Sequence, residues 1–379
     1  MIYLDNAATT KPSKVAIEKA LVFNEEKFFN PSGLYQGGLF CANEIKKAKE
    51  SILRNLGCVN NEVIFTSCGT ESDNTAIFSV VKRGVFVTCK GEHSAVHKSF
   101  LELKNRGLKI EFIDLNEDGS VNVDKLLNFC FNNEVNFVSI MHVNNETGAI
   151  NDINSIAKQI KSINSKIIFH SDGVQAYGKI PYKISNDIDL YSISAHKING
   201  LKGVGALIKK KGLHLSPYII GGGQENGLRS GTENVFGIKV FEYASAEHYN
   251  NLLENFNYVN SLKNEFINGL NKTNFAIISG ENSSPYILTI SAKGLRGEVV
   301  MHSLEEKGII VGNGSACSSK NRFSRVIEAC GYNENILDGV IRISFSAENT
   351  LDEIKNSVSI INETVENLKG ILNKWNKQL

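Results

Sequence analysis

The sequence lacks the features that mark several classes of protein. No uninterrupted apolar stretch approaches about 18 residues, so we expect no membrane span. The formal net charge is only +1, which gives no electrostatic reason to expect nucleic acid or an anionic membrane as a partner. Residues 1–5 contain no basic region leading into a long apolar one, so no secretory signal is expected.

Cysteine is present, but not in pairs. The number of cysteines is odd, they are dispersed, and no C-x-x-C pair occurs among Cys41, Cys58, Cys68, Cys89, Cys130, Cys317 and Cys330. This pattern disfavours a disulfide framework and a zinc site, and it suits a reducing cytoplasm. We therefore predict no metal site and a cytoplasmic location, with most cysteines acting as small core residues.

Nucleotide-binding loops are also missing. Residues 173–179 match G-x-x-x-x-G-K, but Ile180 stands where a serine or threonine must bind magnesium. Residues 200–205 do not form a G-x-G-x-x-G in a first βα turn. Neither segment predicts a nucleotide site.

The pattern from residue 62 onward alternates between short apolar runs and helical segments. Strands are predicted around residues 63–65, 85–87, 110–113, 137–141, 167–170 and 188–193. Such alternation indicates βαβ units and an α/β fold with a mostly parallel sheet. Past about residue 255 the pattern changes to fewer strands, so we predict a large domain over residues 12–255 and a smaller α+β domain over residues 256–379. Residues 1–11 are expected to pack near the smaller domain.

Working residues of a parallel sheet lie beyond the carboxyl ends of its strands. This rule selects residues that all follow predicted strands: Gly69-Thr70, His93, Asn145, Asp172, Gln175 and Lys197. A glycine and a threonine at the start of a helix can bind phosphate, although an ordinary helix cap has the same appearance. The Asp172 carboxylate can pair with a protonated ring nitrogen or can merely cap a turn.

Lys197 ends the segment Ser192-Ile193-Ser194-Ala195-His196-Lys197, which follows an apolar run. A half-buried lysine loses its charge easily, and its amine then attacks carbonyl groups to form a Schiff base. The alternative is a lysine that extends its ammonium group from the strand end into solvent. The lysine alone does not decide between them.

Cys317 lies in a run of small residues, Gly314-Ser315-Ala316-Cys317-Ser318-Ser319. Small polar sequence predicts an exposed, mobile loop, and an exposed thiol oxidises unless it is useful. Cys317 is therefore the one cysteine predicted to be functional. Arg342 follows in a predicted strand and can bind a carboxylate through two hydrogen bonds or pair with a surface acid.

Together these segments resemble the cysteine desulfurases, in the class V branch of the fold-type I pyridoxal-phosphate (PLP) enzymes. The resemblance runs along nearly the whole chain, and the branch it resembles serves iron–sulfur assembly and tRNA thiolation. It rests on residues 3–10, Asn30-Pro31-Ser32, residues 65–72, Glu92-His93, residues 141–146, residues 172–176, Ser194-Ala195-His196-Lys197, residues 221–225, residues 229–234 and Ser315-Ala316-Cys317.

The resemblance implies a role for each matched residue. Lys197 would hold PLP, Asp172 would keep its ring nitrogen protonated, and His93 would stack on the ring and act in acid–base steps. Gln175 and Asn145 would contact the side of the ring that carries its oxygen. The phosphate would be held by Gly69, Thr70, Ser194, His196 and, from a partner subunit, Thr232. Arg342 and Asn30 would orient the carboxylate of the substrate.

The implied activity is a homodimeric desulfurase that converts L-cysteine to L-alanine. The sulfur would pass as a persulfide on Cys317 to a protein acceptor, an iron–sulfur scaffold or a tRNA-thiolating enzyme. Alternatives are another class V enzyme (an aminotransferase, selenocysteine lyase or cysteine lyase), a cysteine hydrolase, and a non-catalytic sulfur carrier. The Cys317 segment separates the desulfurase from the first alternative, and the residues around Lys197 separate it from the other two.

Overall fold

The computed structural model describes residues 1–80, 84–312 and 322–376. Within them, seven strands form one large sheet in the order β2-β8-β7-β6-β5-β3-β4. Six of these strands point the same way, while β8 runs antiparallel to both of its neighbours. The strands are β2 (Glu62–Thr66), β3 (Val85–Cys89), β4 (Lys109–Ile113), β5 (Val135–Ser139), β6 (Ile168–Asp172), β7 (Leu190–Ser194) and β8 (Gly205–Lys209).

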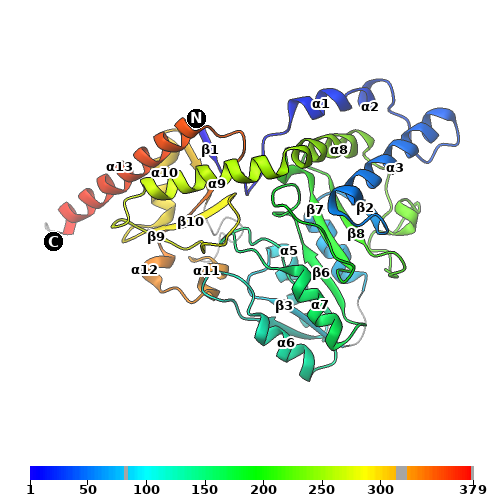
Figure 1. Ribbon diagram of the computed structural model, residues 1–379, viewed down its shortest axis with the longest axis horizontal. Helices are drawn as coiled ribbons and strands as arrows, with labels where there is room; N and C mark the ends of the chain where they lie inside the picture. Colours follow the sequence, from blue (N-terminus) through cyan, green and yellow to red (C-terminus); the bar gives the residue numbers. More distant parts are fainter. Residues whose placement is uncertain (81–83, 313–321, 377–379) are drawn as a thin grey trace.

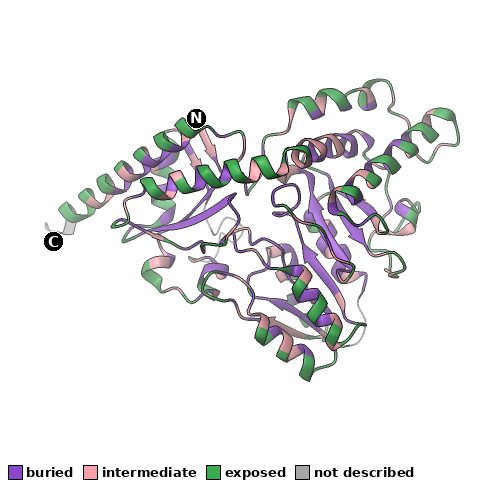
Figure 2. Cartoon of the chain, in the orientation of Figure 1, coloured by how far each residue is buried: buried purple, intermediate pink, exposed green. Residues whose placement is uncertain are grey.

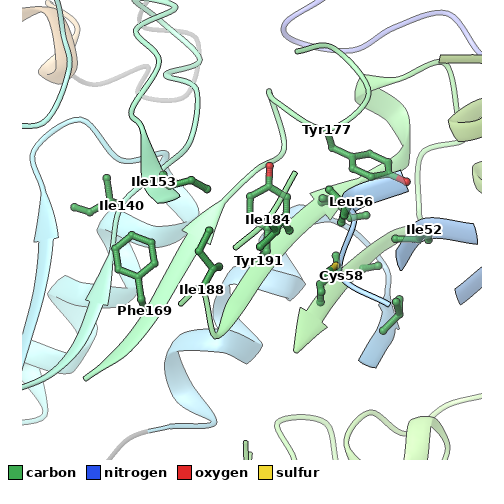
Figure 3. Packing of buried hydrophobic residues seen from close by; sticks show 14 of the residues in the cluster. Ile52, Leu56, Cys58, Ile140, Ile153, Phe169, Tyr177, Ile184, Ile188 and Tyr191 are labelled. Carbon is green, nitrogen blue, oxygen red and sulfur yellow. The ribbon is translucent and has the colours of Figure 1, made fainter. Parts of the chain in front are cut away.

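Helices cover both faces of this sheet (Figure 1). The helices α4 (Gly69–Phe78) and α5 (Ser94–Asn105) pack on one face through a cluster that includes Phe86, Phe100 and Phe137. The other face is buried under α3 (Gln36–Leu56), α6 (Val123–Asn132), α7 (Ile153–Ile163) and α8 (Val235–Asn250). Figure 3 shows part of this second cluster around Phe169 and Tyr191. All of these strands except the edge strand β4 are therefore mostly buried, as the covered faces of a parallel sheet require and as Figure 2 shows.

A second group of elements lies beside the large sheet. Its strands are β9 (Phe275–Ile277), β10 (Ile287–Ala292) and β12 (Val340–Ser344), which form an antiparallel sheet, and β1 (Ile2–Leu4), which pairs in parallel with β11 (Ile309–Val311). Helices α9 (Leu252–Gly269), α10 (Gly297–Glu306) and α13 (Leu351–Asn376) pack with these strands into a separate hydrophobic cluster that includes Leu4. The remaining short helices are α1 (Lys14–Ala20), α2 (Val22–Glu25), α11 (Arg325–Ala329), α12 (Glu334–Leu337) and the 3₁₀ turns η1 (Ala195–Lys197) and η2 (Glu225–Gly227).

The α/β architecture with a mostly parallel sheet is confirmed. The predicted boundary near residue 255 falls inside α9, which continues the direction of α8 in Figure 1, and the division into two domains stays a prediction. Within the described ranges, no helix is long and apolar enough to cross a membrane.

Several helix ends are set by single residues that the sequence makes visible. The Ser13 hydroxyl accepts a hydrogen bond from the Ala16 amide and starts α1. Gly57 ends α3 in the left-handed conformation, with φ of 70°. The strand β8 was not predicted from the sequence, because the glycine-rich segment at residues 199–203 that precedes it is typical of a loop.

Candidate active site

A cavity of about 330 Å³ lies at the carboxyl ends of the large-sheet strands. Ten residues predicted from the sequence line it: Gly69, Thr70, His93, Asn145, Asp172, Gln175, Ser194, His196, Lys197 and Arg342. The first nine follow or end strands of the large sheet or lie in the loops after them, while Arg342 comes from β12. The structure therefore brings together residues that are 273 positions apart, from 69 to 342, in one cavity.

Lys197 lies in the 3₁₀ turn η1 directly after β7. Its Nζ atom donates to the backbone oxygens of Ala7 and Ala8, both at 2.7 Å. The neighbouring His196 shares a hydrogen bond of 3.1 Å between its Nδ1 and the Thr9 hydroxyl. The N-terminal segment thus closes one side of the cavity around the lysine.

Asp172 and His93 form the acid–base part of the cavity. Asp172 is the last residue of β6, it is buried, and its Oδ1 accepts from the Val174 amide at 2.9 Å. Burial raises the pKa of this carboxyl, and the nearby His93 acts in the opposite direction. His93 caps α5, with Nδ1 accepting from the Ala95 amide at 3.2 Å. Burial lowers the pKa of His93 and favours the neutral ring, whose proton lies on Nε2 because Nδ1 accepts a hydrogen bond.

The start of α4 provides a small cradle for an anion. A side-chain carbon at Gly69 would lie 2.8 Å from Cγ2 of Val174 and 3.5 Å from Cβ of Ser194. The Ser194 hydroxyl is buried and has no hydrogen-bond partner among the described residues. Cys68 caps the helix without a side-chain hydrogen bond, so the first amides of α4 stay available to a ligand.

Arg342 closes the cavity from the side of the smaller sheet. Its Nη2 donates to Oδ1 of Asp5 and its Nη1 to the backbone oxygen of Asn145, both at 2.8 Å. The side chain is 7% exposed, and its Nε is buried without a partner in the described part of the chain. The guanidinium is thus fixed in direction and retains a donor for a carboxylate.

Four charged residues of the cavity were given no role from the sequence: Asp73, Glu92, Glu146 and Arg325. Asp73 lies on α4 one turn after Gly69, and helical spacing could have found it. One carboxylate oxygen each of Asp73 and Asp172 and one ring nitrogen of His93 all lie within 4.8 Å of one another. Glu92 is fully buried, its Oε1 accepts from the Met141 amide at 2.7 Å, and burial raises the pKa of its carboxyl to about 8.

Arg325 and Ser324 tie the chain that follows the Cys317 segment to the cavity. Arg325 donates to the backbone oxygens of Lys90 and Glu92, and the Ser324 hydroxyl donates to Glu146. No local pattern in the sequence predicts these contacts, because the partners are about 180 to 235 positions apart.

Three predicted residues are not among those that line this cavity. Asn30 is exposed, and its Oδ1 accepts from the Ser32 amide at 2.9 Å. Thr232 is exposed and lines a separate pocket of about 120 Å³ with Glu225 and Arg229. Cys317 lies outside the described residues. The roles predicted for all three stay predictions.

The cavity has the chemistry that PLP needs. A lysine amine is present for its aldehyde, a buried carboxylate for its ring nitrogen, and a glycine cradle with an unpartnered hydroxyl for its phosphate. The fit rests on the orphaned Ser194 hydroxyl and on the space that Gly69 leaves open. These residues would hold the phosphate, Lys197 the aldehyde carbon and Asp172 the ring nitrogen.

Comparison with known proteins agrees with this geometry. Residues 2–356 match the family model described as aminotransferase class-V. The chain is 34% identical over 383 residues to the cysteine desulfurase IscS of Methanosarcina thermophila, covering 98% of this chain and 93% of that one. It is 35% identical over 387 residues to a cysteine desulfurase of Nostoc sp., covering 98% and 94%.

The fold has solved counterparts. A structure titled NifS-like protein superposes with a TM-score of 0.90 at 32% identity, covering 96% of this chain and 99% of that one. Sequence, fold and cavity agree, and the chain belongs to the PLP-dependent cysteine desulfurase family of the class-V aminotransferases.

Proposed function

We propose that this protein is a PLP-dependent cysteine desulfurase that converts L-cysteine to L-alanine and transfers the sulfur as a persulfide on Cys317 to an acceptor. The observation that carries the proposal is the meeting of Lys197, Asp172 and His93 with an anion cradle in one cavity. The two relatives named above are called cysteine desulfurases, and the match covers nearly their full lengths.

The cofactor supplies an electron sink that acidifies the α-proton of a bound amino acid and allows its carbon–sulfur bond to break. Asp172 keeps a proton on the ring nitrogen, because an anionic carboxylate in a buried place is stabilised by a positive neighbour. Lys197 holds the cofactor and moves the α-proton. His93, with its proton on Nε2, would donate a hydrogen bond from that N–H and stack on the ring, and its acid–base role would require Nδ1 to release the Ala95 amide.

The substrate is oriented from the opposite side. Arg342 binds the carboxylate of cysteine with the donors that Asp5 and Asn145 leave, and Asn30 assists. Asn145 and Gln175 bind the side of the ring that carries its oxygen. Gly69, Thr70, Ser194 and His196 hold the phosphate, with Thr232 of a second subunit reaching the same group.

The sulfur step uses the Cys317 thiolate as the nucleophile, together with the electron sink that the cofactor would supply. Its sulfur forms a bond with the sulfur of the substrate while the substrate's carbon–sulfur bond breaks, and the electron pair goes to the carbon. That carbon takes up one proton, the α-carbon regains the proton it lost, and alanine leaves, so cysteine, thiolate and one proton give alanine and persulfide with no added oxidant.

The assembly, location and domain division belong to the same proposal. A homodimer is supported by strongly exposed apolar side chains, including Leu34 at 92% and Ile220 at 87% exposure. A cytoplasmic location is supported by the described cysteines, all of which are free.

A large cofactor domain at 12–255 and a small domain at 256–379 are supported by the separate hydrophobic cluster of the smaller sheet. The acceptor is a protein of iron–sulfur assembly or tRNA thiolation.

The test is a pair of assays on the purified holoenzyme. Incubation with L-cysteine should release alanine, and with a reductant it should also release sulfide. Cys317→Ser should keep bound PLP but lose nearly all alanine formation, since five of the six described cysteines are buried and the sixth, Cys68, caps α4 beside the proposed phosphate site. Full activity in Cys317→Ser would overturn the proposed nucleophile, and the absence of PLP from the wild-type protein would overturn the cofactor assignment.

A further inference from the structure

Lys179 is a buried lysine that the proposed reaction does not use. It is 4% exposed, and no acidic group in the described ranges lies within ion-pair distance of it. Its side chain makes one hydrogen bond to a described residue, in which Nζ donates to Oε1 of Gln175 at 3.0 Å. Burying a cation without a carboxylate partner costs free energy of folding. The hydrogen bond to Gln175 is the contact that can explain why a lysine occupies this position.

The groups that face Lys179 are neutral or cationic. They come from four elements or loops: Lys197 and His196 in η1, Arg342 in β12, His248 in α8, and Tyr286 before β10, whose ring centroid lies 5.9 Å from Nζ. Burial, followed by repulsion from Lys197 and Arg342, lowers the pKa of Lys179 to about 7. The position therefore carries a cost in stability that a neutral side chain would avoid.

The contact fixes which way the Gln175 amide points. The Gln175 Nε2 donates to the backbone oxygen of Ala7 at 2.9 Å, and a carbonyl oxygen can only accept. On the other side Lys179 donates to Oε1. Both neighbours require the same orientation, so the amide cannot turn over without placing oxygen against oxygen. The second hydrogen on Nε2 has no acceptor among the described residues.

The same Ala7 oxygen also accepts from Nζ of Lys197 at 2.7 Å. Lys179, Gln175, Ala7 and Lys197 thus form one hydrogen-bonded chain from the buried side of the cavity to the lysine that holds the cofactor. A change at Lys179 would therefore act on the site through these hydrogen bonds, since Lys179 is not among the residues that line the cavity.

We infer that Lys179 is a positioning residue that locks the Gln175 amide with its N–H group available to the cavity. The Gln175 side of the cavity then presents an N–H donor. It would bind an acceptor, the phenolic oxygen of the cofactor ring, and would disfavour a ligand group that is itself a donor. The inference rests on the proposed function for the identity of this oxygen. An N–H donor would stabilise the anionic form of this oxygen and so lower the pH at which the visible absorbance of the bound cofactor changes.

The experiment compares Lys179→Met, which removes the donor, with Lys179→Gln, which removes the charge and keeps a donor. The readout is the pH midpoint at which the visible absorbance of bound PLP changes, together with thermal unfolding of each protein without PLP. Lys263→Met is the matched control, because Lys263 is also buried, at 5% exposure, and bonds Ser283 and Ser284 away from the cavity.

Lys179→Met should raise the midpoint by about one pH unit, the equivalent of one weakened hydrogen bond to a charged group. Lys179→Gln should raise it by less than half as much, and Lys263→Met should change thermal unfolding only. Equal shifts in both Lys179 variants would assign the effect to charge and overturn the inference, as would an unchanged midpoint in Lys179→Met. A wild-type protein without PLP absorbance would instead overturn the proposed function, and the inference with it.

Discussion

The two walls of the cavity are built in different ways. One wall consists of the carboxyl ends of strands that point the same way, where Gly69, Lys197, Asp172 and His93 lie, in that order along the sheet edge, at the ends of β2, β7, β6 and β3. The other wall consists of Arg342 and Arg325, which reach the cavity through single contacts between distant segments. The first wall carries the residues proposed to hold the cofactor, and the second carries those proposed to handle the substrate.

This difference separates two physical tasks. A cofactor that stays in place for many reactions suits a wall of buried strands, whose positions are fixed by hydrogen bonds on both sides. A substrate that enters and leaves suits a wall held by a few charge-assisted contacts. Damage to the first wall should therefore abolish the bound cofactor, whereas damage to the second should change substrate handling and leave the cofactor bound.

The largest effect is expected from Lys197→Ala in the strand-end wall. The variant should lose the visible absorbance of lysine-bound PLP and at least about 10³-fold in the rate of alanine formation, since it loses both the attachment point and the proton carrier. Absorbance spectra and an alanine assay measure the two losses. A variant that keeps the wild-type spectrum would show that another amine holds the cofactor.

Arg342→Met tests the opposite wall. Loss of a charge-assisted hydrogen bond to the carboxylate should raise KM for cysteine by about 10- to 100-fold, while the PLP spectrum stays unchanged. Steady-state kinetics and absorbance together check this separation. Loss of PLP from Arg342→Met would contradict the division of labour between the walls. Asp5→Asn, which removes the anionic partner of the same guanidinium, should bind PLP equally well.

Glu92 lies where the two walls meet, because its carboxyl contacts Met141 while its backbone oxygen accepts from Arg325. Its folded-state pKa of about 8 lies above its ordinary value of 4.5. The folded protein therefore keeps a proton that the unfolded chain releases, and this contribution to stability is present below about pH 4.5 and is lost as the pH rises through about 8.

Glu92→Gln should remove this dependence and keep the acceptor for the Met141 amide. Relative to wild type, the variant should gain about 3 kcal/mol in the free energy of unfolding between pH 5 and pH 8, from a folded-state pKa of about 8 against an ordinary value of 4.5. Urea unfolding at the two pH values measures the gain. An identical pH dependence in both proteins would show that the carboxyl is ionised in the fold.

The smallest effect is expected from Arg325→Met. The change removes the contacts to Lys90 and Glu92 that fix the chain eight residues after Cys317, so persulfide formation should slow by about tenfold with PLP loading unchanged. Single-turnover labelling of the persulfide measures the rate. Arg322→Met is the control, because Arg322 is 61% exposed and pairs with Asp338; an equal slowing in both variants would argue against a role for the Arg325 contacts.

The contrast between the walls also explains which residues of the site could be predicted from the sequence and which could not. Asp172 and Lys197 were found because apolar strands are visible in sequence and their carboxyl ends meet at one edge. Asp5 with Arg342, and Arg325 with Glu92, were not found as pairs, because contacts across more than 200 positions leave no local pattern. The strand β8 was missed for a local reason, since its glycine-rich approach is typical of a loop. Lys179 was dismissed with a nucleotide-loop motif, and only its burial beside Gln175 made it informative.

The proposed reaction requires both the cofactor site around Lys197 and the thiol of Cys317. One measurement tests most directly whether they act together. The holoenzyme is treated with L-cysteine, digested without reductant, and the peptide that contains Cys317 is weighed by mass spectrometry, with Lys197→Ala as the control. The account predicts a gain of one sulfur atom on Cys317 in the wild-type protein and none in the control. An unmodified Cys317 in a wild-type protein that still releases alanine would contradict it.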